Sequence, residues 1–277
     1  MASSTSTLAP SNSSDANFRL WGKAISDAFA AGGWVKQENN INWGSVTAPG
    51  AAATVTGYEI WRSNDGTNQI YVKIEYGSGV SSASNPAISF QVGWGSDGAG
   101  NLTGFTSTKQ TTFTSSNSNS ATAYNCNFHA AAGSVCIFMW TNWGGIGTTA
   151  FSVERTRDAS NNKQDEVLIF YGNAGGSNNN QILNRTSGVF PAETGGKLAV
   201  NSSNAISSGN IGLGLLFGQK GGFVGPSQNI FGSTTANIGA TQTTFTLESY
   251  GETHTYIVNS ASGITFTSGV ALITRFD

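Results

Sequence analysis

The stretch of residues 57–104 constrains the fold more than any other part of the chain. Its first half reads GYEIWRSNDGTNQIYVKIEYGSG, with two β-rich runs on either side of an Asn-Asp-Gly turn at 64–66. This pattern is typical of an antiparallel hairpin. A third β-rich run, PAISFQVGWG, follows a Ser-rich bend and ends in a glycine-broken turn at 96–101. We therefore expect the hairpin 57–77 and the strand after it to form the central sheet of a β-sandwich.

The rest of the chain continues in short β-type segments, separated by clusters of Gly, Asn, Ser and Asp. Strands are expected at residues 55–63, 69–77, 87–95, 105–114, 122–130, 134–141, 149–157, 165–172, 197–200, 211–217, 242–250, 252–259 and 270–276. Many short strands with regular turn signals favour a mainly β, antiparallel sandwich or jelly-roll-like fold. The least patterned region, 173–210, is expected to be a surface excursion.

One segment, residues 17–31, has helical periodicity. It predicts a short N-terminal amphipathic helix, capped by Asn17 or Asp15 and ended by two glycines. Its apolar stripe consists of Phe18, Trp21, Ile25 and Phe29. The stripe either packs in the core of its own chain or forms assembly contacts with a partner chain.

The domain organisation expected from these segments is simple. Residues 1–36 form a polar arm followed by the helix, and the arm lies either on its own domain or on a neighbouring subunit. Residues 37–277 form a single β-rich domain. The hairpin 57–77 and a second Arg- and Asp-containing hairpin at 153–172 share a layout, so an internal duplication is left open.

Composition excludes several classes of protein. Only 10% of the residues are charged and the net charge is −2, so nucleic acid is not an expected partner, because phosphate binding needs clustered Lys and Arg. The chain has no run long enough for membrane insertion and no signal peptide at its N-terminus, which predicts synthesis in a cytoplasm. In that reducing environment Cys126 and Cys136 are expected to be buried free thiols, although a disulfide across a hairpin is the alternative.

No pattern predicts a metal site, a cofactor or a catalytic residue. Asp65 and Asp97 lie in turn sequences that lack the carboxylates of a calcium loop. Glu252, His254 and Tyr256 alternate along a predicted strand and share one face. We interpret this row as the polar outer face of a sheet, and acid–base chemistry is the alternative.

Four glutamates on candidate hairpin strands are expected to form exposed ion pairs, which contribute little to stability. They are Glu59, Glu75, Glu154 and Glu166, with Arg62, Lys73, Arg155 and Arg157 as candidate partners.

Aromatic side chains next to amides and carboxylates provide candidate glycan-stacking positions. One set is Trp140, Asn142 and Trp143, and the other is Trp94 with Asp97. A pocket with a few placed polar groups beside an indole face suits a sugar. Tryptophans in β proteins more often fill cores and interfaces.

Several segments together resemble a family of virion structural proteins from tailed bacteriophages. They are FRLWGKAISDAFAAGGWV, INWGSVTAP, GYEIWRSND, VKIEYGSG, GWGSDGAGNLTG, FSVERTRDASNNKQDEVLIFYG, GETHTYIV and GVALITRFD. The resemblance spans most of the chain except about 105–145 and 173–240. It implies a virion location, assembly with copies of itself and other virion proteins, and no enzymatic activity, and it implies no site residues.

The expected function is therefore a structural component of a tailed-phage virion, associated with the tail, the baseplate or a fibre. A capsid decoration (cement) protein is one alternative. A carbohydrate-binding module that attaches to a host surface glycan is the other.

Overall fold

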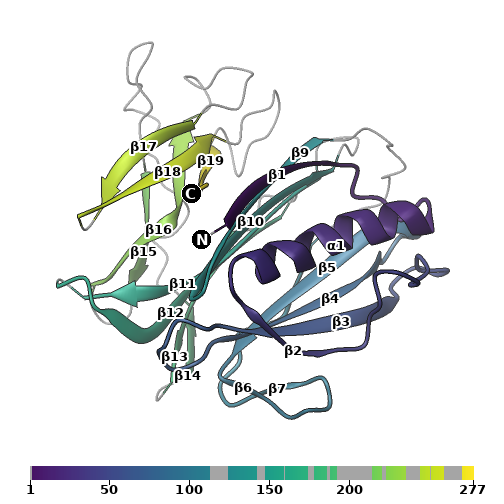
Figure 1. Cartoon of the computed structure of the whole chain (residues 1–277), viewed down its shortest axis with the longest axis horizontal. Coiled ribbons are helices and arrows are strands. Elements are labelled where there is room, and N and C mark those ends of the chain that lie inside the picture. The colour runs from purple at the N-terminus through teal and green to yellow at the C-terminus, as the bar shows by residue number, and fades with distance from the viewer. Residues whose placement is uncertain are drawn as a thin grey trace.

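A computed structural model describes residues 2–112, 124–141, 147–158, 160–173, 178–185, 188–191, 214–219, 223–234, 244–249, 251–258 and 270–277 (Figure 1). The protein is mainly β, as predicted, with antiparallel sheets of seven, five and five strands among these residues. The described residues also contain a single helix, α1 (Asp15–Ala31).

The largest sheet has the strand order β1-β9-β10-β11-β12-β13-β14. Its strands are β1 (Ala2–Leu8), β9 (Tyr124–Ala131), β10 (Ser134–Thr141), β11 (Gly147–Arg157), β12 (Lys163–Asn173), β13 (Asn178–Asn184) and β14 (Gly188–Pro191). The polar arm thus lies on its own chain, since β1 pairs with β9 from Ala2↔Ala130 to Leu8↔Tyr124. The predicted surface excursion at 173–210 is wrong where β13 and β14 occur, and the strand predicted at 197–200 lies outside the described residues.

The second sheet has the order β2-β3-β4-β5-β8. Its strands are β2 (Val35–Asn39), β3 (Val55–Arg62), β4 (Tyr71–Gly79), β5 (Ser82–Gly93) and β8 (Gln110–Thr112), and a small ribbon, β6 (Gly95–Ser96) with β7 (Leu102–Thr103), follows β5. The hairpin expected at 57–77 is confirmed, because β3 and β4 pair from Val55↔Gly77 to Arg62↔Tyr71. The hairpin expected at 153–172 is confirmed as β11–β12.

The cap of helix α1 lies one residue before Asp15 and three residues before Asn17, the two predicted caps. Ser14 is the N-cap, and its Oγ accepts a hydrogen bond from the Asn17 N–H at 3.2 Å. A serine hydroxyl in this place satisfies one of the N–H groups that the first turn leaves without a partner. The helix ends at the predicted glycine pair, where Gly33 has a φ of 85° that favours glycine.

The two sheets enclose the main core together with the apolar stripe of α1. All four stripe residues are fully buried within the chain, so the alternative that they contact a partner chain is wrong. The stripe packs on the second sheet through Trp21 with Tyr76, whose ring centroids are 6.0 Å apart. Phe90 of β5 stacks on Phe151 of β11 at 4.1 Å and joins the second sheet to the largest one.

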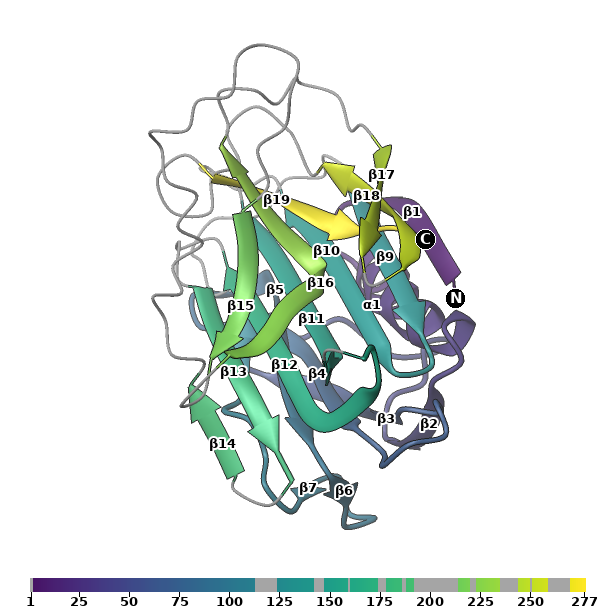
Figure 2. The same cartoon turned by 90° about the vertical axis from the view of Figure 1, so that its left-hand side faces the viewer.

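A third sheet lies over the other face of the seven-stranded sheet (Figure 2). Its order is β15-β16-β19-β18-β17, from β15 (Gly214–Gln219), β16 (Phe223–Thr234), β17 (Thr244–Ser249), β18 (Glu252–Val258) and β19 (Val270–Arg275). Polar groups take part in the contact, since Asn229 Nδ2 of β16 donates to the hydroxyls of Ser134, at 2.9 Å, and Ser152, at 3.0 Å. The molecule is therefore a β-sandwich that carries a further sheet on the outer face of its seven-stranded layer.

Two further expectations concern the described residues. Cys126 and Cys136 are buried thiols outside any disulfide, as predicted, and burial raises the pKa of the Cys136 thiol well above its ordinary value. None of the helical structure described is long and apolar enough to cross a membrane.

Candidate functional site

A polar cavity of about 510 Å³ opens at one end of the seven-stranded sheet. The β9–β10 turn, the β11–β12 hairpin, the β3–β4 loop and the third sheet all contribute to its wall. Its ionisable side chains are Asp65, Glu154, Arg155, Arg157, Lys163, Glu252, His254, Arg275 and Asp277. Such a concentration is unusual in a chain with so few charged residues, which makes this cavity the candidate functional site.

The side chain of Asp65, in the β3–β4 loop, contacts strand β11. Its Oδ2 accepts a hydrogen bond from Arg155 Nε at 2.8 Å, and both side chains are almost completely buried. Arg155 also donates to the carbonyl oxygen of Asn68. Lys163 Nζ lies 3.4 Å from Asp65 Oδ2. Burial alone would raise the pKa of Asp65, but the bonds from Arg155 and Thr67 outweigh it and hold the pKa below its ordinary value. Asp65 is thus an ionised link between two sheets as well as a turn residue.

Gly133, in the β9–β10 turn, leaves the space that the Asp65 carboxylate occupies, because a Cβ at this position would overlap it. We expect Gly133→Ala to lower the free energy of unfolding by about 1–3 kcal/mol, since overpacking must displace the carboxylate from Arg155. Urea denaturation measures this. Gly50→Ala is the matched control, because nothing lies within 4 Å of the added methyl group. Equal effects of the two substitutions would contradict the role given to Gly133.

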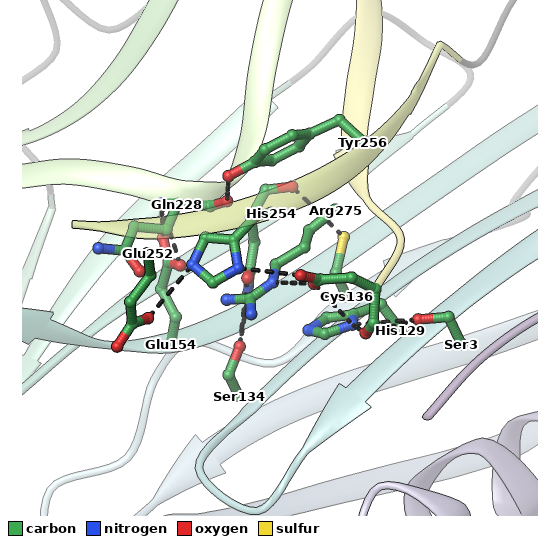
Figure 3. A network of polar contacts seen from close by, with 12 residues as sticks. Ser3, His129, Ser134, Cys136, Glu154, Gln228, Glu252, His254, Tyr256 and Arg275 are labelled. Carbon is green, nitrogen blue, oxygen red and sulfur yellow. Dashed lines mark hydrogen bonds and ion pairs between the residues drawn. The ribbon is translucent and has the colours of Figure 1, made fainter. Parts of the chain in front are cut away.

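His254, on β18, lies between two carboxylates (Figure 3). Its Nδ1 is 2.9 Å from Asp277 Oδ2, and its Nε2 is 3.3 Å from Glu252 Oε2. Asp277 Oδ1 also accepts a bond from Arg275 Nε at 2.6 Å. Burial would raise the pKa of Asp277, but the bonds from Arg275 and His254 outweigh it and lower the pKa.

The interpretation of Glu252, His254 and Tyr256 as an outer polar face is wrong. His254 and Tyr256 are buried, and the Tyr256 hydroxyl donates to the Gln228 carbonyl oxygen at 2.7 Å. Only Glu252 of the three is exposed. The reason is that this face of β18 turns toward the seven-stranded sheet and the segment after β19, which a single strand pattern does not reveal.

Glu154 is the most perturbed acid of the cavity. It lies on β11, on the face that the third sheet covers, and accepts the Gln228 N–H at 3.0 Å. Burial raises its pKa to about 7, against the smaller lowering effects of hydrogen bonds from Ser227 and Gln228 and of the Arg275 charge. The predicted exposed ion pair of Glu154 is therefore wrong, and burial shifts this carboxyl toward its protonated form.

His129, on β9, lies just behind the cavity wall. It is fully buried, and its Nδ1 is 2.7 Å from the Asp277 carbonyl oxygen, which also accepts the Ser3 hydroxyl at 2.7 Å. Burial, reinforced by the Arg275 charge, lowers the pKa of His129 to about 4. The imidazole is therefore neutral at physiological pH. No sequence signal singled out this residue.

Glu59 is likewise buried rather than exposed, because β3 lies beneath helix α1. Its carboxylate accepts from five donors, namely Ser26 Oγ (2.9 Å), Lys36 Nζ (2.6 Å), Trp43 Nε1 (3.1 Å), Trp61 Nε1 (3.3 Å) and the Tyr76 hydroxyl (3.0 Å). Glu75 does form the ion pair predicted for it, because its carboxylate is 2.9 Å from Lys73 Nζ. Glu166 instead accepts the Asn184 amide at 2.6 Å.

Trp94 and Asp97, the glycan-stacking candidates whose side chains the structure describes, do not line the cavity. Trp94 is partly buried, and the Arg185 guanidinium lies 4.5 Å from its ring centroid. Asp97 accepts the N–H groups of Ala99 and Asn101 within its own turn. The side chain of Trp140, together with Asn142 and Trp143, lies outside the described residues.

The cavity combines four cationic side chains with four carboxyl groups and a histidine. Across the part of the chain that the structure describes, no three His, Cys, Asp or Glu side chains are placed to hold a metal ion. The arrangement can bind charged or strongly polar groups, and Glu154 can exchange a proton near neutral pH. Comparison of the chain with protein-family models, with curated proteins and with solved structures finds no match in any of the three.

Proposed function

We propose that this protein is a structural component of a tailed-bacteriophage virion, made in the host cytoplasm and assembled in several copies with other virion proteins. Its place is on the tail side, in a baseplate or fibre-associated position, and it has no enzymatic activity of its own. The proposal starts from the resemblance of eight sequence segments to virion structural proteins.

One structural observation supports it: the segments that carry the resemblance contact one another. Trp21 packs on Tyr76, Asp65 pairs with Arg155 at 2.8 Å, and Arg157 lies 3.6 Å from Glu252. These contacts join segments more than fifty residues apart into one frame. In that frame the charged groups link sheets to one another, as expected for a rigid building unit.

Quantitative mass spectrometry of purified virions tests the proposal. A tail-side subunit is expected in multiples of three or six, on the order of tens of copies or fewer per particle, because tail assemblies follow closed rotational symmetry. A count of hundreds of copies per particle would contradict the tail placement and favour a capsid decoration protein. Absence of the protein from intact particles would overturn the virion proposal.

A further inference from the structure

We propose that the polar cavity is a binding site for a small molecule that carries a carboxylate or phosphate group on a polar body. This goes beyond a structural role and does not depend on it. The volume of about 510 Å³ lies within the range of small-molecule sites.

One arginine of the cavity wall uses only some of its hydrogen-bond donors. Arg155 is more than nine-tenths buried, and it lines the cavity. Its Nε and Nη2 bind Asp65 and Asn68, whereas Nη1 has no hydrogen-bond partner among the described residues. A buried guanidinium nitrogen without a partner is costly, and this one is closed to solvent, so a slight turn of the guanidinium toward the cavity would let an oxyanion of a ligand satisfy it.

Two further cations beside that arginine are partly exposed to solvent. Lys163 is 39% exposed and its carboxylate partner is 3.4 Å away, and Arg157 is 19% exposed with its partner at 3.6 Å. Both partners are shared or partly solvated, because Asp65 also binds Arg155 and Glu252 is 45% exposed. Arg157 also donates to Asn161 Oδ1 at 2.8 Å, so Lys163 is the side chain that can turn toward an incoming anion at the lower cost.

The charge of the whole cavity wall also favours an anion. The four cations Arg155, Arg157, Lys163 and Arg275 face the carboxyl groups of Asp65, Glu154, Glu252 and Asp277. Burial favours the protonated form of Glu154, and with this carboxyl neutral the four cations outnumber the three remaining carboxylates. An anion is therefore favoured over a cation, and its binding weakens when Glu154 ionises.

Isothermal titration calorimetry of the full chain tests the site at about pH 6, where Glu154 is mostly neutral. The probes are sodium phosphate, glucuronate and glucose, the last two differing in the carboxylate alone. We expect saturable binding of at least one anion and none of glucose. Glucuronate binding would identify a carboxylated sugar as the ligand class, and phosphate binding a phosphorylated one.

Two rim variants and a control locate the binding. Lys163→Gln and Arg157→Gln are each expected to weaken anion binding about tenfold, the loss of one charge-assisted hydrogen bond. Lys23→Gln, on the exposed face of α1 away from the cavity, is expected to bind as the natural protein does. Glu154→Gln is expected to remove the decline of affinity above about pH 7.

Three results would overturn the site. They are no saturable binding of either anion, glucose binding as tight as glucuronate binding, and rim variants that bind like Lys23→Gln.

Discussion

Replacing Glu59 by alanine is expected to lower the free energy of unfolding by about 3–5 kcal/mol. The carboxylate is inaccessible to solvent and accepts bonds from five side chains on α1, β2, β3, β4 and the loop after β2. Without it, two indole N–H groups and the Tyr76 hydroxyl lose their common acceptor inside the core. A buried donor without a partner costs more than the net value of a hydrogen bond, so the loss exceeds that of an ordinary ion pair.

Urea denaturation with a matched glutamate separates this effect from a general loss of charge. Glu75 lies on the neighbouring strand β4 and binds two lysines near the surface. Glu75→Ala is expected to cost about 1 kcal/mol. Glu59→Gln keeps one acceptor oxygen and should fall between the two. A cost of Glu59→Ala no larger than that of Glu75→Ala would refute the central role of Glu59.

The second large effect concerns pH. Glu154 and His129 are expected to cancel each other's influence on stability between about pH 4.5 and 6.5. Glu154 has a pKa of about 7 in the folded chain against 4.5 ordinarily, so the folded state binds the extra proton. Its contribution is complete below about pH 4.5 and is lost, by about 3 kcal/mol, as pH rises through 7.

His129 acts in the opposite direction. Its pKa is about 4 in the folded chain against 6.5 ordinarily, so the unfolded state binds the extra proton. Its contribution is complete above about pH 6.5 and is lost, again by about 3 kcal/mol, as pH falls through 4. Over the shared range the two slopes have opposite signs and similar size.

Single variants uncover the two slopes. Glu154→Gln is expected to leave a protein whose free energy of unfolding rises by about 3 kcal/mol from pH 4 to pH 6.5, because His129 then acts alone. His129→Gln is expected to show the reverse, a decline from pH 4.5 to 7. Urea denaturation at several pH values measures both, relative to the natural protein, whose other ionisable groups are unchanged. Curves of both variants that run parallel to the natural one would refute the opposition.

The parts of this fold that the sequence predicts are those encoded locally. The β3–β4 and β11–β12 hairpins and helix α1 have their turn residues and periodicity within about twenty residues. Strand β1 was missed because ASSTSTL shows no alternation of apolar and polar residues. Strand β16 was missed because a Gly-Pro pair interrupts its pattern.

The candidate site is poorly encoded in local pattern because each of its partners comes from a distant segment. Asp65 and Arg155 are ninety residues apart, and Glu154 is buried by a strand that begins about seventy residues later. Hairpin spacing places both glutamates, Glu59 and Glu154, correctly on strands. It does not say which face another sheet will cover, and burial is what changes their chemistry.

The pairing of β1 with β9 has a consequence for synthesis on the ribosome. The partner of β1 begins at Tyr124, more than a hundred residues downstream. At roughly 5–20 residues per second, β1 waits about 6–25 s before any of β9 exists. A strand of alanine, serine and threonine with one leucine is a poor seed for association between nascent chains during that delay. The polar sequence of β1, which gives no strand pattern, therefore also lowers the tendency of nascent chains to associate through this strand.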